Sequence, residues 1–191
     1  ISKTKGLEIT NVGVNPSRTG VLQALQKMGA NIEVKNQRQE SGEPCADLII
    51  KESVLRGVEL SGDIIPNIID EIPIISIAAA FADGETVIRD AAELRVKESD
   101  RLKAVSDGFT RLGVAHENFE DGMSIMGSSN TLLMDQSISI ESHEDHRIAM
   151  SFLIAGLKCS KPITVIDCKN IFTSFPDFIE LISSIGYKLE K

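Results

Sequence analysis

The chain has 191 residues, with 28 Asp or Glu against 20 Lys or Arg, which gives a formal net charge of −8. This acidic balance argues against a generic nucleic-acid or membrane-surface binder, which attracts its polyanionic partner through a basic surface. At 42% apolar and 25% charged residues, the composition is that of a globular protein with a packed core and excludes disorder driven by charge.

The longest apolar stretch, residues 72–82, contains a proline and is much shorter than the ~20 residues of a membrane-spanning helix, so we expect no membrane partner. The three cysteines, Cys45, Cys159 and Cys168, form no closely spaced pair. They predict reduced thiols in a cytoplasmic protein. Because the sequence begins with Ile1 rather than Met, we expect it to be a piece of a longer protein.

Three helical patterns end on a similar phrase that contains a glycine. The phrases are LQKMGANIEV, FTRLGVAHEN and LISSIGYKLE, with Gly29, Gly113 and Gly186. Each glycine follows apolar residues at helical spacing, and a left-handed glycine is a common helix stop. The predicted helices cover residues 22–28, 102–112 and 178–185.

A second phrase also occurs twice, at 70–90 and 145–167. In both copies an aspartate, Asp70 or Asp145, opens an apolar Ala-rich helix that leads into a strand containing T-V-I, and residues 7–15 resemble an earlier copy of that strand. The pattern predicts about two and a half copies of one unit: strand, helix, strand or hairpin, strand, helix, strand. It indicates a mixed α/β architecture.

The predicted helix starts all carry polar residues. Asn15-Pro16 is expected to open the first helix and Ser174 to cap the last, with Pro176 and Asp177 in its first turn. The other three starts carry Asp70, Lys97 to Arg101, and Asp145 to Arg147. If the repeated units are related by rotation, these starts face one side, where the positive ends of the helix dipoles favour anions.

The densest charged cluster is R-V-K-E-S-D-R at 95–101, just before the predicted helix over 102–112. Lys97 and Arg101 are four residues apart and are expected to share one helix face, with Glu98 beside them. Two cations and a carboxylate suit a bound phosphate or carboxylate that needs proton transfer nearby. A solvated, salt-bridged helix start fits the same pattern, and charge spacing does not separate the two interpretations.

The second cluster, Asp145-His146-Arg147, suits either anion binding with proton transfer or a helix cap with a surface ion pair. His143 and His146 lack a third ligand nearby in the sequence, so no metal site is expected. Asp70 suits either a partly desolvated general base or a helix N-cap.

Taken together, these residues resemble the C-terminal part of the 5-enolpyruvylshikimate-3-phosphate synthase family. The motifs are N-P-S-R-T-G at 15–20, D-E-I-P at 70–73, L-R-V-K-E-S-D-R at 94–101, D-H-R-I-A-M at 145–150 and T-S-F-P at 173–176. The resemblance implies that residues 1–191 are one domain, most of the C-terminal-half domain of a two-domain enolpyruvyl transferase. It also implies an α/β prism of repeated βαβαββ-type units with pseudo-threefold symmetry, whose helix N-termini face the cleft between domains.

The resemblance further implies transfer of the enolpyruvyl group of phosphoenolpyruvate to the 5-hydroxyl of shikimate 3-phosphate, with release of phosphate through a tetrahedral intermediate. The implied partners are these two substrates and the missing N-terminal domain, with no nucleic acid and no membrane. No metal or organic cofactor is implied. The chain would supply half of the site and be inactive alone.

The family pattern also assigns roles to residues. Asp70 would contact shikimate 3-phosphate and accept the proton of the attacking hydroxyl, and Lys97 would lie between the two substrates. Glu98 would deliver a proton to the methylene carbon, supported by His146. The residues implied to bind phosphoenolpyruvate are Lys97, Arg101 and Arg147.

One departure from the family pattern is Thr173, which stands where many members have a lysine of the phosphoenolpyruvate site. Two alternatives remain. The related transferase acting on UDP-N-acetylglucosamine generally lacks R-V-K-E-S-D-R. A non-catalytic anion-binding or assembly domain on the same scaffold would have no need to retain Asp70, Glu98 and both arginines. His116 has no identifiable partner in the sequence and is expected to be a surface or strand residue.

Overall fold

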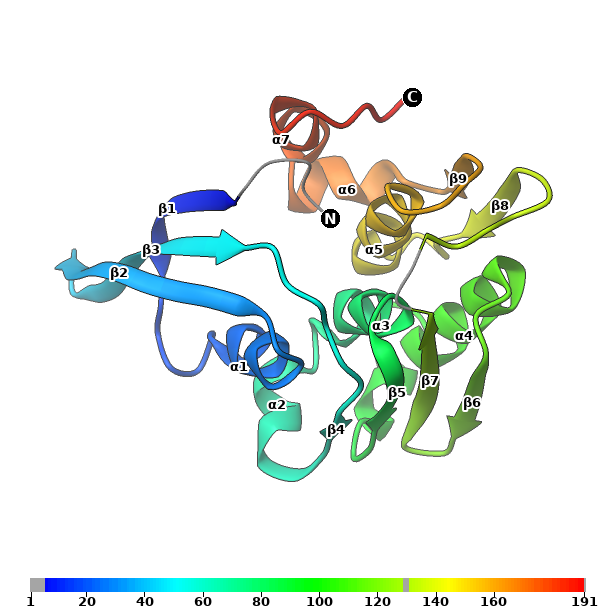
Figure 1. Ribbon diagram of the computed structural model, residues 1–191, viewed down its shortest axis with the longest axis horizontal. Helices are drawn as coiled ribbons and strands as arrows, with labels where there is room; N and C mark the ends of the chain where they lie inside the picture. Colours follow the sequence, from blue (N-terminus) through cyan, green and yellow to red (C-terminus); the bar gives the residue numbers. More distant parts are fainter. Residues whose placement is uncertain (1–5, 129–130, 191) are drawn as a thin grey trace.

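The computed structural model describes residues 6–128 and 131–190, in which three small β-sheets surround a group of helices (Figure 1). In chain order the elements are β1 (Leu7–Gly13), α1 (Gly20–Lys27), β2 (Asn31–Glu40), β3 (Glu43–Lys51), β4 (Glu59–Leu60), η1 (Gly62–Ile64), α2 (Ile65–Ile68), α3 (Ile72–Ala80), β5 (Asp83–Ile88), η2 (Ala92–Val96), α4 (Arg101–Leu112), β6 (His116–Phe119), β7 (Gly122–Ser128), β8 (Ile138–Glu141), α5 (His146–Gly156), β9 (Ile163–Ile166), α6 (Lys169–Ser174) and α7 (Phe178–Ser184). The α/β class expected from the sequence is confirmed.

The sheets show the internal repeat directly. Strands β5, β7 and β6 pair antiparallel in the same order as β1, β3 and β2, and the parallel pair β8 and β9 repeats the parallel pair β4 and β5. Helices occupy matching places, because α1 and α4 follow the first strand of a unit while α3 and α5 precede the last. The prediction of about two and a half copies is therefore confirmed.

Helix α3 lies in the middle of Figure 1, between the sheets. Apart from Ser76 it consists of apolar residues, as expected of a largely buried helix, and Ile72 and Ile75 are each 1% exposed. Helix α5 packs against α3 and against β9. Among the described residues, no helix combines the length and the apolar character needed to cross a membrane.

The predicted glycine stops and T-V-I strands are confirmed. Gly29, Gly113 and Gly186 have φ angles of 94°, 71° and 92° and follow α1, α4 and α7. This left-handed conformation suits glycine, which has no Cβ to clash with the backbone. The strands that contain the repeated phrase are β5 and β9, which both end on it, and β1 is their earlier copy.

Two predicted helix starts are wrong. Helix α1 begins at Gly20, because Asn15 closes a turn instead: its side-chain oxygen accepts the backbone N–H of Ser17 over 3.1 Å. Ser174 is the last residue of α6 and caps nothing, while Asp177 is the N-cap of α7. Phe175 precedes a proline and is held out of the helical region, at φ −146° and ψ 80°, which separates the two helices.

Helices α4 and α5 approach each other closely at Gly108. A Cβ at this position would lie 2.1 Å from Cζ of the fully buried Phe152. We expect Gly108→Ala to lower the free energy of unfolding by about 1–3 kcal/mol, because the phenyl ring has no free space to move into. Urea denaturation followed by circular dichroism measures this change.

Gly156→Ala in α5 is the matched control, because its Cβ would meet Ile163 at an ordinary 3.7 Å. We expect a change within about 1 kcal/mol, set mainly by helix propensity. Equal losses for the two substitutions would contradict the close contact of α4 with α5.

Candidate active site

Arg101, the first residue of α4, is the point on which the charged side chains converge. Its side chain is 1% exposed. Nε donates to Oδ2 of Asp145 over 2.8 Å, Nη1 to Oδ1 of Asp70 over 2.9 Å, and Nη2 to Oε2 of Glu98 over 2.5 Å. One buried guanidinium thus joins carboxylates that precede three different helices, α3, α4 and α5.

Asp145 links this arginine to the start of α5. Its side chain is fully buried and serves as the N-cap of the helix: Oδ1 accepts the backbone N–H of Arg147 over 2.9 Å and that of Ile148 over 3.4 Å. The hydroxyl of Ser99 donates to Oδ2 over 3.1 Å. Asp145 therefore satisfies a helix start and neutralises a buried cation at the same time.

The pKa values of this buried pair are shifted. Burial acts to lower the pKa of Arg101, but the hydrogen bond to Asp145 and the nearby carboxylates outweigh it, so the pKa is raised. Burial acts to raise the pKa of Asp145, but the guanidinium and the two capped N–H groups outweigh it, so this pKa lies below its usual value. Both shifts favour the charged forms.

Asp70 forms the open side of the cluster, with its side chain 42% exposed. Its carboxylate lies 2.9 Å from Nη1 of Arg101, 3.7 Å from Nη2 of Arg147 and 3.8 Å from Nζ of Lys97. The alternative of an N-cap is wrong, since Glu71 occupies that position of α3. The structure thus brings residues 70 and 147, far apart in the sequence, to the same face.

Lys97 lies outside α4, because the helix begins at Arg101 with Asp100 as its N-cap. The expectation that Lys97 and Arg101 share one helix face is therefore wrong, and the two cations meet at Asp70 instead. Glu93 accepts from Nζ of Lys97 over 2.6 Å, and this bond raises the pKa of the lysine. Glu93 was not among the predicted site residues, although its i, i+4 spacing from Lys97 is a recognisable signal.

Three predicted residues remain, His146, Thr173 and His116. His146 is the half-buried first residue of α5, and in the described part of the chain its imidazole forms no hydrogen bond or ion pair with the cluster. Thr173 is exposed near the end of α6. His116 does have a partner, which the sequence did not reveal: Nε2 lies 2.8 Å from Oγ of Ser106, and Nδ1 lies 2.8 Å from the carbonyl oxygen of Val114.

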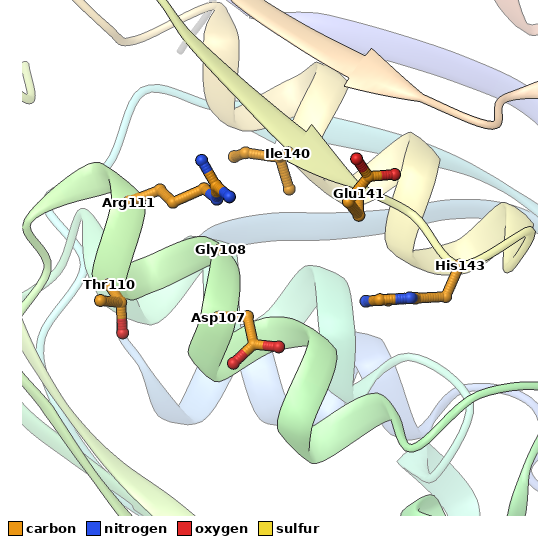
Figure 2. A pocket seen from close by; sticks show the side chains of 7 residues that line it. All are labelled: Asp107, Gly108, Thr110, Arg111, Ile140, Glu141 and His143. Carbon is orange, nitrogen blue, oxygen red and sulfur yellow. The ribbon is translucent and has the colours of Figure 1, made fainter.

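Figure 2 shows a hollow between α4 and β8, lined in part by Asp107, Arg111, Glu141 and His143. None of the residues around Arg101 lines it, so the charged cluster is a separate feature of the surface. Over residues 6–128 and 131–190, no three His, Cys, Asp or Glu side chains are grouped so as to hold a metal ion.

The accessible groups of the cluster define its chemistry. The side chains of Lys97 and Arg147 are 22% and 32% exposed. The carboxylate of Asp70 lies within 4 Å of both, and that of Glu98, 56% exposed, is bound to Arg101. Two reachable cations suit an anionic ligand, and two partly exposed carboxylates can exchange protons with it. Cations and carboxylates in this arrangement are able to support acid–base chemistry on an anion.

The fold is that of the enolpyruvyl transferases. The crystal structure of the enolpyruvyl transferase NikO from Streptomyces tendae superimposes with a TM-score of 0.73, at 19% identity, over 95% of this chain and 39% of that one. The profile of the family described as EPSP synthase (3-phosphoshikimate 1-carboxyvinyltransferase) matches residues 1–182. The chain therefore belongs to the EPSP synthase family.

Similar proteins agree with this assignment. The 2.37 Å structure of EPSP synthase from Acinetobacter baumannii has a TM-score of 0.92 and 45% identity over 97% of this chain and 42% of that one. The 3-phosphoshikimate 1-carboxyvinyltransferases of Geotalea daltonii and Magnetococcus marinus are 49% and 47% identical over 94% and 95% of this chain. The chain spans 41% and 40% of the length of these two relatives.

Asp145→Asn tests the buried ion pair. Asparagine still accepts the N–H groups of the helix start but leaves Arg101 without its buried counter-charge. We expect a loss of about 3–5 kcal/mol in the free energy of unfolding at pH 7. Asp70→Asn, which changes the partly exposed partner of the same arginine, is the control and should cost about 1 kcal/mol or less.

The loss should also depend on pH. Because the folded-state pKa of Asp145 is lowered, its contribution is fully present above the unfolded pKa of about 3.9 and is lost as the pH falls through the folded value. The difference between the parent protein and Asp145→Asn should thus shrink below about pH 4. Denaturant titrations at several pH values measure it, and a difference that stays constant into this range would contradict the assigned pairing.

Proposed function

We propose that this chain is the C-terminal-half domain of a two-domain 3-phosphoshikimate 1-carboxyvinyltransferase. The enzyme would transfer the enolpyruvyl group of phosphoenolpyruvate to the 5-hydroxyl of shikimate 3-phosphate and release phosphate. Membership of the family and the chain's share of its relatives' length support this assignment. The free thiols Cys45, Cys159 and Cys168 fit a cytoplasmic enzyme.

The observation that carries the proposal is the convergence of Lys97, Arg101 and Arg147 on Asp70. Both substrates are polyanions, whereas the chain has a net charge of −8. An acidic protein must concentrate cations locally to bind such ligands and to stabilise the charge that develops during reaction. This cluster does so at the starts of three helices, where the positive end of each helix dipole also favours an anion.

The carboxylates would carry the protons. In the addition step the 5-hydroxyl oxygen bonds to C2 of phosphoenolpyruvate, its proton passes to Asp70, and protonated Glu98 gives a proton to the methylene carbon. In the elimination step Glu98 takes a proton back from the methyl group, the C2–O bond to phosphate breaks, and the leaving phosphate takes the proton held by Asp70. Both carboxyl groups then return to their starting states.

The burial of Arg101 adds a condition to this scheme. In the structure Nη2 of Arg101 donates to the carboxylate of Glu98, and the Arg101 side chain is almost completely buried. We propose that the phosphate or carboxylate of phosphoenolpyruvate takes the place of Glu98 on the arginine, which frees Glu98 for proton delivery. Arg147 and Lys97 are already accessible and would bind the anion first, with His146 supporting the same site.

A hybrid protein tests this function directly. In it, the present chain replaces the matching segment of the Acinetobacter baumannii synthase, whose fold is the same. We expect the hybrid to release phosphate from phosphoenolpyruvate when shikimate 3-phosphate is present, and the chain alone to show no turnover. Asp70→Asn in the hybrid should lower kcat by about 10²–10⁴-fold, the usual contribution of a general base.

Asp107→Asn is the control, because Asp107 is an exposed carboxylate on α4 that pairs with Lys103, one helical turn earlier. Its kcat should equal that of the parent hybrid. A folded hybrid without turnover would contradict the proposed function, and an active Asp70→Asn hybrid would contradict the role of Asp70.

A further inference from the structure

Arg95 connects three elements beside the site without contacting the cluster around Arg101. It lies near the end of η2 and uses all three guanidinium nitrogens. Nε donates to the carbonyl of Glu120 over 2.7 Å, Nη2 to that of Phe119 over 2.7 Å, and Nη1 to Oδ2 of Asp100 over 3.1 Å. The first acceptor belongs to the turn between β6 and β7, the second is the last residue of β6, and the third is the N-cap of α4.

The turn between β6 and β7 is held in place by contacts with the end of β5 and with the segment before η2. A Cβ on Gly122, at the start of β7, would lie 2.0 Å from the carbonyl oxygen of Ile88, so the turn packs directly against the end of β5. The carbonyl of Asp121 accepts the N–H of Ala91 over 2.7 Å, which ties the turn to the segment leading into η2. Arg95 therefore binds to backbone that the sheet holds in place.

Asp100 closes the other end of the segment. Its Oδ1 accepts the backbone N–H of Lys103 over 2.9 Å and so caps α4, while its Oδ2 accepts from Arg95. The hydrogen bond between Arg95 and Asp100 thus joins the two ends of the loop between them. Lys97 and Glu98, both proposed site residues, lie inside this loop.

We infer that Arg95 is a positioning residue of the proposed synthase, which holds the loop of Lys97 and Glu98 through the β6–β7 turn and the cap of α4. The inference rests on the proposed function for its kinetic consequence and on the contacts of Arg95 for its structural one. A displacement of a reacting group by about 1 Å is enough to cost about 10²-fold in rate, so an anchor outside the site can control turnover.

The geometry requires an arginine. Two adjacent carbonyls and a carboxylate surround one planar group, and a guanidinium presents donors to all three at fixed angles. A lysine ammonium is a single point charge on a flexible stem and does not reproduce this fork. Arg95→Lys therefore keeps the charge but removes the three-way connection.

The kinetic test uses the hybrid synthase. Arg95→Lys should lower kcat by about 10- to 100-fold, because Lys97 and Glu98 both lose their fixed positions while Arg101 and Arg147 lie outside the loop. The matched control is Arg89→Lys. Arg89 contacts the same turn, with Nη1 3.3 Å from Asp121, but not the loop, so its kcat should stay within about twofold of the parent.

Asp100→Asn gives a second, independent variant. Asparagine is an equally good N-cap, so α4 keeps its start, but the charge that binds Arg95 is lost. We expect a fall in kcat in the same direction. The double variant should fall no further than Arg95→Lys alone, since Arg95→Lys already removes the contact with Asp100. Fully additive losses would contradict the inference.

Hydrogen–deuterium exchange on the chain alone separates this inference from the proposed function. Exchange of the backbone amides of residues 96–103 should become at least about tenfold faster in Arg95→Lys and stay unchanged in Arg89→Lys. Unchanged exchange in Arg95→Lys, or a kcat within about twofold of an active parent hybrid, would overturn the inference. A hybrid without activity would contradict only the proposed function, and the exchange comparison would still decide the role of Arg95.

Discussion

A buried guanidinium needs carboxylate partners, because a charge removed from water without a counter-charge costs several kcal/mol. Arg101 is 1% exposed and obtains its partners from Asp70, Glu98 and Asp145. Since these carboxylates precede three different helices, neutralising one side chain brings three helix starts together. The positions of the accessible cations, Lys97 and Arg147, follow from that constraint.

The repeated unit makes this convergence possible. Strand β4 lies parallel to β5 and β8 parallel to β9, and the chain passes from β4 to β5 through α3 and from β8 to β9 through α5. Helices α3 and α5 therefore begin at equivalent places and pack against each other. Charged residues at both starts, together with those before α4, bring Lys97, Arg101 and Arg147 to one place on a chain that is acidic as a whole.

The sequence predicted what depends on periodicity and local backbone conformation. The repeat, the stops at Gly113 and its equivalents, and the T-V-I strands all follow from spacing and from the tolerance of glycine for positive φ. It did not predict that Asn15 would close a turn instead of opening α1, or that Lys97 would leave the helical conformation, because tertiary contacts decide between such local alternatives. The sequence did not predict the burial of Arg101 either, because it depends on a contact with Asp145, 44 residues away.

The crystal structure of the Arg101→Lys variant tests the central claim most directly. An ammonium keeps the positive charge but does not hold three carboxylates in fixed directions as the guanidinium does. The account predicts that the buried Asp145 keeps the ion pair, while the carboxylates of Asp70 and Glu98 turn away into solvent. If both carboxylates kept their present positions with lysine at this site, the convergence would have another cause and the account would be contradicted.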